Sequence, residues 1–214
     1  FGATIDFDDV THKGITNIST DDVAVAQELG YVIKLVGDVR EVESGISAEV
    51  SPTFLPKNHP LASVNDVMNA VFVESIGIGE SMYYGPGAGQ KPTATSVLAD
   101  IIRIARRLSD GNVGKPFNEF RRDLPLANPA DVKSNYYFAL DTPDEKGKIL
   151  HLSEIFNSED ISFEQVLQQK ANGTTARIVV ITHAMSKTQL KAVTEKLEAA
   201  EDFTVVNTLK VLSN

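Results

Sequence analysis

Apolar and polar positions near the start of the chain follow first a helical and then a strand pattern. Residues 19–22 offer N-capping side chains, and apolar residues at helical spacing follow them. Together with Gly30, which is suited to the position just after a helix, they predict a short helix. The run 31–39 is β-rich and apolar on both faces over much of its length, which predicts a central strand. Residues 46–55 predict its hairpin partner, reached through a turn at 43–45.

Two more strands are predicted after this hairpin, at residues 71–76 and 79–84, with a tight turn at Gly77. Together with the first hairpin they predict a mostly antiparallel sheet with helices on one face. A long helix is predicted from about residue 93 to residue 108, where arginines gather near the C-terminal end and complement the helix dipole. Its apolar positions recur at helical spacing: Val97, Ile101, Ile104, Ala105 and Leu108.

The last third of the chain has a regular rhythm of strands and helices. Strands are predicted at 136–140, 162–168, 177–182 and 203–211, and helices at 147–156 and 186–199. The resulting order is βαββαβ, the ferredoxin-like split βαβ arrangement. The fold class expected for the whole chain is α+β.

Glycine and proline are dense between Gly111 and Pro129, where no periodicity is sustained, and this predicts a linker. We therefore expect an N-terminal part at 1–112, a linker at 113–130 and a C-terminal domain at 131–214. The N-terminal part and the C-terminal domain are each long enough to bury a core of their own.

Composition and charge exclude several classes of protein. The 214 residues include 20 Lys and Arg against 29 Asp and Glu, and this net charge of −9 argues against a nucleic-acid partner. The absence of cysteine excludes disulfides, thiolate metal sites and a cysteine nucleophile. No apolar run reaches the roughly 18–20 residues of a membrane helix, so we expect no membrane partner. The chain opens without Met or a basic leader, so it is either processed or a piece of something longer.

The segment Gly85-Pro86-Gly87-Ala88-Gly89 is the most distinctive local feature. Three glycines before a helix let the backbone approach a ligand closely and direct amides toward an anion. A plain turn that returns the helix to the sheet explains the same spacing. The segment is neither a P-loop nor the Gly-x-Gly-x-x-Gly dinucleotide fingerprint.

A second candidate site is the turn 141–147, between the first strand and first helix of the βαββαβ unit. Backbone amides at the N-terminus of that helix are suited to a small carboxylate ligand. A simple strand–helix connection is the alternative interpretation. The residue types provide no catalytic residues and no metal site elsewhere, since the four histidines are scattered and no nucleophile elbow occurs.

Several linked motifs resemble, in the same order, those of bacterial homoserine dehydrogenases. They are Phe7-Asp8-Asp9-Val10, Gly14–Ile18, Glu28–Leu35, Pro56–Ala62, Asn69–Val73 and Tyr84–Gly89. The resemblance covers essentially the whole chain. The C-terminal unit is similar to the ACT domain that bacterial members carry as a regulatory tail. Asp144 and Gly147 match the Asp-x-x-Gly turn where ACT domains hold an amino acid, although Lys146 stands where the family commonly has proline.

The resemblance implies a parent enzyme that interconverts L-aspartate 4-semialdehyde and L-homoserine with NAD(P)H, in threonine and methionine biosynthesis in the cytoplasm. It places the dinucleotide domain and the catalytic lysine upstream of Phe1, so this chain alone is expected to be inactive and to bind no cofactor. Only the glycine-rich segment would contact the cofactor, with Gly89 the best match and Gly85 and Gly87 beside it. Residues 1–112 would be the end of the catalytic and dimerisation domain.

The resemblance also implies partners. We expect a homo-oligomer, formed through the N-terminal sheet, the ACT domains or both, and an amino-acid effector such as threonine. Two other interpretations stay open. One is a non-catalytic, amino-acid-sensing ACT-type module on a dimerising sheet, and the other is a purely structural oligomerisation domain.

Overall fold

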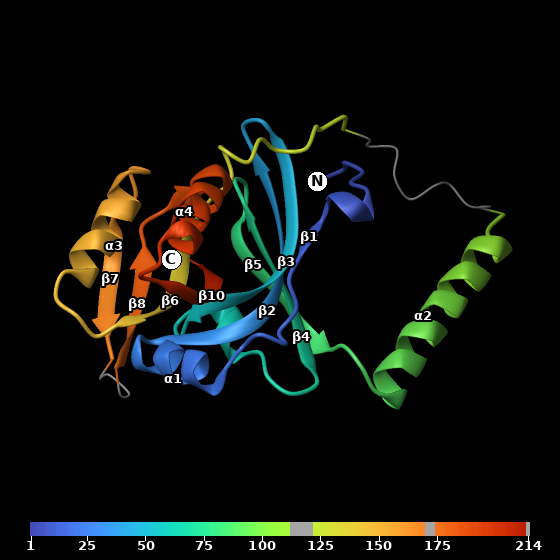
Figure 1. The fold of residues 1–214 in the computed structure, drawn as a ribbon. Helices are drawn as coiled ribbons and strands as arrows, with labels where there is room; N and C mark the ends of the chain where they lie inside the picture. The colour runs from blue at the N-terminus through green and yellow to red at the C-terminus, as the bar shows by residue number, and fades with distance from the viewer. Residues whose placement is uncertain (112–121, 170–173, 213–214) are drawn as a thin grey trace. The chain divides into compact units, whose positions relative to one another are not determined.

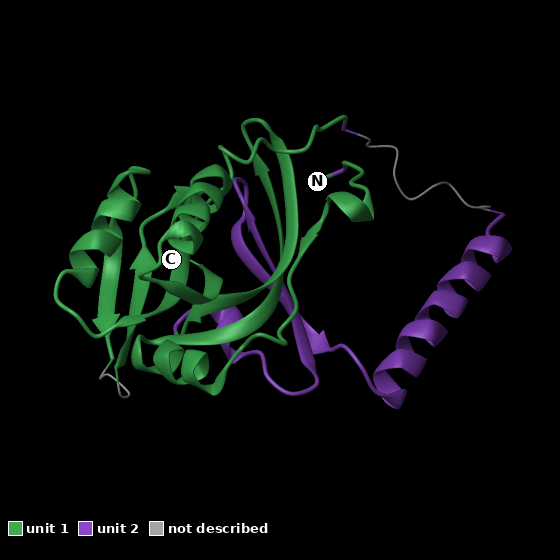
Figure 2. Ribbon diagram, viewed as in Figure 1, with its two compact units in different colours: residues 1, 3–57, 123–214 green, residues 2, 58–122 purple. Residues whose placement is uncertain are grey.

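The computed structural model describes residues 1–111, 122–169 and 174–212 (Figure 1). The chain divides into two compact units (Figure 2). Unit 1 contains residues 1, 3–57 and 123–214, and unit 2 contains residues 2 and 58–122. Much of the predicted linker 113–130 lies outside the described residues, so the division into 1–112, 113–130 and 131–214 stays a prediction.

Unit 1 begins with a capped helix and a long hairpin, as the sequence pattern predicts. The elements are η1 (Phe7–Asp9), β1 (Thr11–His12), α1 (Thr20–Glu28), β2 (Tyr31–Val42) and β3 (Gly45–Pro56). Helix α1 starts with a capping box, in which the Ser19 side chain accepts from the Asp22 amide and the Asp22 side chain accepts from the Ser19 amide. Gly30, at φ +86°, follows the end of the helix.

The β2–β3 hairpin turns between Val42 and Gly45, which are paired in register. Gly45 has φ +145°, and a Cβ atom there would lie 2.1 Å from the carbonyl oxygen of Pro125. That oxygen accepts a hydrogen bond from the amide of Ile46 at 2.9 Å. Only glycine therefore fits where the segment after Asp123 runs against the start of β3.

The prediction of β2 as a central strand is wrong. Within the described residues β2 pairs only with β3, and its alternate positions, such as Leu35 and Val39, are exposed. The apolar run led to the wrong prediction because only its start is packed: Tyr31 and Ile33 contact a core, while Leu35 and Val39, further along the same face, are exposed.

The C-terminal part of unit 1 alternates strands and helices from Lys133 to Val211. Its elements are β6 (Lys133–Pro143), α3 (Lys148–Asn157), β7 (Phe163–Gln168), β8 (Thr175–Thr182), β9 (Met185–Ser186), α4 (Lys187–Ala199) and β10 (Thr204–Val211). The four long strands lie in the order β10-β6-β8-β7, and every neighbouring pair is antiparallel. Helices α3 and α4 lie on one side of them in Figure 1.

The two hairpins do not share the single antiparallel sheet that the sequence pattern predicts. Strands β4 (Met68–Ser75) and β5 (Gly79–Pro86) form a two-stranded sheet in unit 2. The β2–β3 hairpin instead joins the C-terminal strands, because β3 pairs in parallel with β10, Lys210 opposite Thr53 and Val211 opposite Phe54. Mixed α+β structure around a mostly sheet core is nevertheless confirmed.

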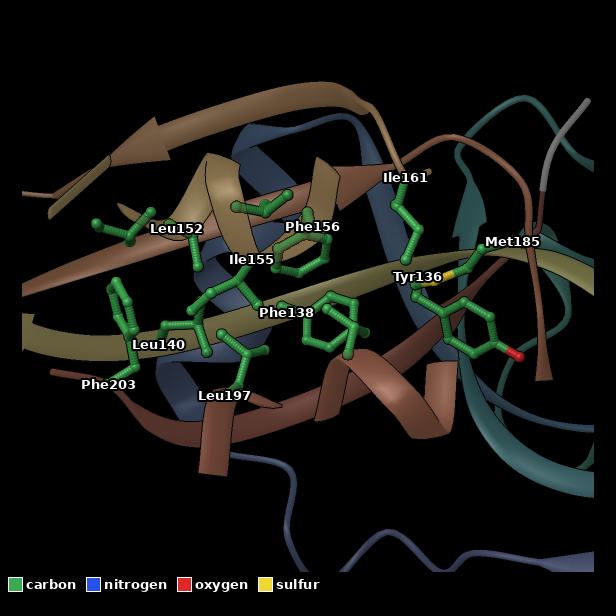
Figure 3. Close-up of a cluster of buried hydrophobic side chains, with 13 residues drawn as sticks. Tyr136, Phe138, Leu140, Leu152, Ile155, Phe156, Ile161, Met185, Leu197 and Phe203 are labelled. Carbon is green, nitrogen blue, oxygen red and sulfur yellow. The ribbon is translucent and has the colours of Figure 1, made fainter. Parts of the chain in front are cut away.

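Two hydrophobic clusters cover the opposite faces of strand β6. Its even-numbered residues Tyr136, Phe138 and Leu140 pack with side chains of α3 and α4 (Figure 3). Its odd-numbered residues Tyr137 and Ala139 pack with α1 and β3. Since alternate side chains of a strand point to opposite faces, β6 is buried on both sides.

Unit 2 contains η2 (Pro60–Ser63), the β4–β5 hairpin and the long helix α2 (Gln90–Ser109). No described residue of α2 is buried. None of the helices in the described parts of the chain combines the length and the apolar character that crossing a membrane requires.

Candidate functional site

The glycine-rich segment connects strand β5 to helix α2 within unit 2. Gly89 is the N-cap residue of α2 at φ +119°, and no side chain caps the helix. Gly87 donates its amide to the carbonyl of Val67 at 3.2 Å, and a Cβ atom on Gly87 would lie 1.7 Å from Nδ2 of Asn69. At Gly85 a Cβ atom would meet nothing within 4 Å.

These three positions therefore differ in what requires glycine. The Asn69 side chain excludes a Cβ atom at Gly87, and the positive φ favours glycine at Gly89. At Gly85 there is open space, which leaves room for an approaching molecule. The first amides of a 20-residue helix carry the positive end of its dipole, so the segment fits a ligand with negative charge.

Helix α2 presents an uncovered apolar face directly after this segment. Its first turns line a shallow, largely apolar depression of about 710 Å³, formed by Gly89, Gln90, Thr93, Ala94, Val97 and Leu98. Ile101, Ile104 and Leu108 continue the exposed face toward the C-terminal end. An amphipathic helix of this length is normally stabilised by packing of its apolar face, so this face is suited to contact with another protein surface.

The turn 141–147 lines a second depression, of about 320 Å³, in unit 1. Its walls are Thr142, Pro143, Asp144, Glu145, Lys146, Gly147, Lys148, Ile149, Leu150, Gln168 and Ile178. Gly147 is the N-cap residue of α3 at φ +92°, and no side chain caps this helix either. The structure thus brings Asp144 and Gly147 to one depression, with an acidic side chain and a helix N-terminus in its wall.

A small charged cluster fixes the helix end of this depression. Lys148 Nζ donates to Asp202 at 2.8 Å and lies 3.3 Å from Glu145, while His151 Nδ1 lies 2.7 Å from Asp202. The hydrogen bond to Asp202 raises the pKa of Lys148. Hydrogen bonds from Lys148 and His151 lower the pKa of Asp202. Lys148 is therefore charged at neutral pH beside the turn.

Sequence reasoning included Thr142 in the turn 141–147 but missed the contributions of Gln168 and Asp202 to this region. The Thr142 side chain is buried, and its hydroxyl has no hydrogen-bond partner among the described residues. Gln168 comes from β7 and Asp202 from the segment before β10, far from the turn in sequence. No local pattern marks such residues, because only the strand order brings them together.

His59, one of the four scattered histidines, has a structural role in the turn before β4. His59 is the N-cap residue of η2 and accepts from the Leu61 amide at 3.2 Å, which is the structural role that a turn histidine suggests. Burial lowers the pKa of His59. Within residues 1–111, 122–169 and 174–212, no three His, Cys, Asp or Glu side chains gather as metal ligands would.

Comparison with known proteins gives matches along the whole chain. Residues 1–102 match the family model described as homoserine dehydrogenase. The homoserine dehydrogenase of Lactococcus lactis is 58% identical over 214 residues, covering 100% of this chain and 50% of the relative. That of Bacillus subtilis is 34% identical over 203 residues, covering 94% and 47%.

Solved structures agree with these matches. The crystal structure of a homoserine dehydrogenase from Thiobacillus denitrificans superimposes with a TM-score of 0.90 at 30% identity, covering 100% of this chain and 50% of that one. A homoserine dehydrogenase structure from S. aureus has a TM-score of 0.67 at 23% identity, covering 98% and 48%. The chain therefore spans about half the length of the curated relatives that it matches.

Proposed function

The chain belongs to the homoserine dehydrogenase family, and from this premise we propose that it is the C-terminal part of an enzyme interconverting L-aspartate 4-semialdehyde and L-homoserine with NAD(P)H. The observation that carries the proposal is similarity along all 214 residues to one half of longer homoserine dehydrogenases. The parent enzyme would then act in threonine and methionine biosynthesis.

The residues of unit 2 fit a nicotinamide cofactor at the glycine-rich segment. Gly85 and Gly89 leave the backbone open to a ligand, whereas the Asn69 side chain lies against Gly87, and α2 directs uncapped amides along its axis. When bound, the nicotinamide supplies or accepts the hydride. The role of this chain is to orient the cofactor and to exclude water from one side of it.

The apolar face of α2 supports an active site that two halves of the enzyme form together. In this proposal it packs on the dinucleotide-binding half, and the catalytic lysine belongs to that half too. The 214-residue chain alone then oxidises no homoserine and retains no NAD(P).

A hybrid enzyme tests this function directly. The matching half of the Lactococcus lactis enzyme is replaced by this chain, and homoserine oxidation is followed by NAD(P)H absorbance. We expect turnover by the hybrid and none by the chain alone. A hybrid that folds but lacks activity would contradict the proposal, as would turnover by the chain alone.

A second function, amino-acid sensing, is favoured by the depression at the turn 141–147. The strand–helix–strand–strand–helix–strand order and the β10-β6-β8-β7 strand order support an ACT-type domain at 131–214. Asp144 would pair with a ligand ammonium group and the Gly147 end of α3 would hold its carboxylate.

Calorimetry with a panel of amino acids that includes threonine, followed by an NMR titration, tests the sensing role. We expect heat of binding from one of them, with shifts of the Asp144–Gly147 amides. Binding that leaves those amides unshifted would overturn the assignment of this site.

The same chain would also form a homodimer, in which exposed residues of its sheet contact those of a second copy.

A further inference from the structure

Buried charge is concentrated at one place in unit 1. Among the residues that the structure describes, the buried charged side chains are those of Asp22, Glu49 and Lys210. All three lie where α1 and the β2–β3 hairpin meet β6 and β10, and we call this contact the seam (Figure 1). A buried charge is costly unless a partner compensates it, and here every partner set crosses the seam.

Lys210 of β10 forms the first polar connection. Its side chain is 6% exposed, and its ammonium group donates to Asp38 of β2 and to Glu49 of β3. Asp38 also pairs with Arg40 at 2.8 Å, and Glu49 with Lys187 at 2.8 Å. Burial alone would raise the pKa values of both carboxyl groups, but the charge of Lys210 brings them below their ordinary values.

Lys187 extends this connection to helix α4. It is the first residue of that helix, and its amide donates to the carbonyls of Pro129 and Val132, both at 3.1 Å. One chain of charges thus runs from both strands of the hairpin, through Lys210 and Glu49, to the start of α4.

Asp22 of α1 forms the second connection. Besides closing the capping box, its carboxylate accepts from the Tyr137 hydroxyl of β6 at 2.9 Å and from Asn207 Nδ2 of β10 at 3.0 Å. Asn207 lies at the irregularity in the β10–β6 ladder, so its side chain turns toward α1 where the register shifts. The N-terminus of α1 is therefore hydrogen-bonded to two strands of the C-terminal sheet.

Apolar packing fills the rest of the seam. Phe54 stacks on Tyr137 with ring centroids 4.5 Å apart, and Val25, Ala26, Leu209 and Val211 belong to the same cluster. Apolar contact is non-directional and tolerates sliding of one layer on another. Buried ion pairs and hydrogen bonds have defined geometry, so they fix the position of α1 and the β2–β3 hairpin relative to the C-terminal strands.

We propose that the seam is a locked joint, in which Lys210 and Asp22 hold the β2–β3 hairpin and α1 to the C-terminal strands. The hairpin and α1 then unfold together with the C-terminal strands, as one cooperative unit. A displacement of α4 or β10 is then transmitted to the hairpin. This inference goes beyond the proposed catalytic and sensing functions, because it involves neither the glycine-rich segment nor the turn 141–147. Lys210 acts here as a positioning residue.

Native-state hydrogen exchange of the 214-residue chain, at increasing urea, tests the joint. In the unaltered chain we expect the slowest amides of β3 and β8 to share one opening free energy. In Lys210→Met the β3 amides should exchange at least tenfold faster than those of β8. Lys191→Met is the matched control, because Lys191 is an exposed lysine of α4, 3.9 Å from Glu195, and should leave the shared opening intact.

A third variant separates the lost connection from charge repulsion. Lys210→Met combined with Asp38→Asn and Glu49→Gln leaves no unpaired carboxylates, and it serves equally if the single variant fails to fold. We expect β3 still to open before β8 in this variant. Three outcomes would overturn the proposal. One is separate opening of β3 and β8 in the unaltered chain, and another is equally faster amide exchange of both strands in Lys210→Met. The third is a shared opening of β3 and β8 in the triple variant.

Discussion

Gly45 shows how one residue type is required by a single backbone contact. An added Cβ atom would lie 2.1 Å from the Pro125 carbonyl oxygen, at a φ of +145° that side chains rarely adopt. Gly45→Ala should therefore lower the free energy of unfolding by about 1–3 kcal/mol, measured by urea denaturation. Gly37→Ala in the same hairpin is the control, because its Cβ atom would meet only Val50 Cγ2 at 3.9 Å. Equal losses in both variants would contradict the argument.

Asp22 should give the stability of the chain a dependence on pH. Hydrogen bonds from Ser19, Asn207 and Tyr137 outweigh burial and lower its pKa in the folded chain. A lowered pKa contributes stability that is present above the unfolded value of about 3.9 and is lost as the pH falls through the folded value.

Asp22→Asn should consequently cost about 1–3 kcal/mol at pH 7 and progressively less as the pH is lowered below 4. Urea denaturation at pH 7 and pH 3 measures the difference. Asp21→Asn is the control, since that side chain is 71% exposed and lies 3.6 Å from Arg177. A cost that does not depend on pH would show that the charge of Asp22 is irrelevant.

Single residues also mark the limit of sequence reasoning. The caps at Ser19 and Ser186 can be predicted, because their partners lie three residues away. Lys210 reads as an ordinary surface lysine, since both of its partners lie more than 150 residues earlier in the chain. Composition and spacing contain no information about such pairs.

At the scale of elements, helix α2 tests whether its apolar face is a contact surface. Ile101→Ser combined with Ile104→Ser should abolish homoserine oxidation in the Lactococcus lactis hybrid, because the packing of the two halves would lose apolar area. In the isolated chain the same change should reduce binding of a hydrophobic dye. Arg103→Ser, a 67% exposed position in the same stretch of α2, is the matched control. Undiminished activity of the double variant would exclude the proposed contact.

Most elements could be predicted because their signals are local. Helix α1 begins and ends at its cap signals, and α2 extends the predicted 93–108 by a few residues at its start. The pairing of elements could not be predicted equally well. Strand β2 is apolar enough for a central position, yet it lies at an edge, since hydropathy does not specify which neighbour a strand finds.

At the scale of the whole molecule, the β4–β5 sheet is the place to test self-association. Val71 and Tyr83 are directly opposite in register, and they are 62% and 69% exposed. Val71→Glu should convert a dimer to a monomer in sedimentation or light-scattering measurements, because a charge would be buried without a partner. Glu74→Gln, on the same strand, should leave the mass unchanged. A monomeric unaltered chain would contradict the proposed homodimer.

The candidate site could be predicted only in part at this scale. The glycine-rich segment and the turn 141–147 stand out in the sequence, and the structure places each at an uncapped helix N-terminus. Gln168 reaches the depression beside the turn 141–147 through the strand order, which periodicity does not specify. The sheet topology could not be predicted either, because the parallel pairing of β3 with β10 joins segments about 150 residues apart in the sequence.

That pairing has a consequence for synthesis on the ribosome. Glu49 and Lys210 are 161 residues apart, so at about 5–20 residues per second the free edge of β3 waits on the order of ten seconds for β10 to emerge. During that interval the stretch of β3 at Thr53 and Phe54 is an unpaired strand edge, and the carboxylates of Asp38 and Glu49 lie on the same hairpin. Negative charge on the hairpin would repel other acidic chains and hinder aggregation at the nascent edge, until β10 arrives with Lys210, which pairs with both carboxylates.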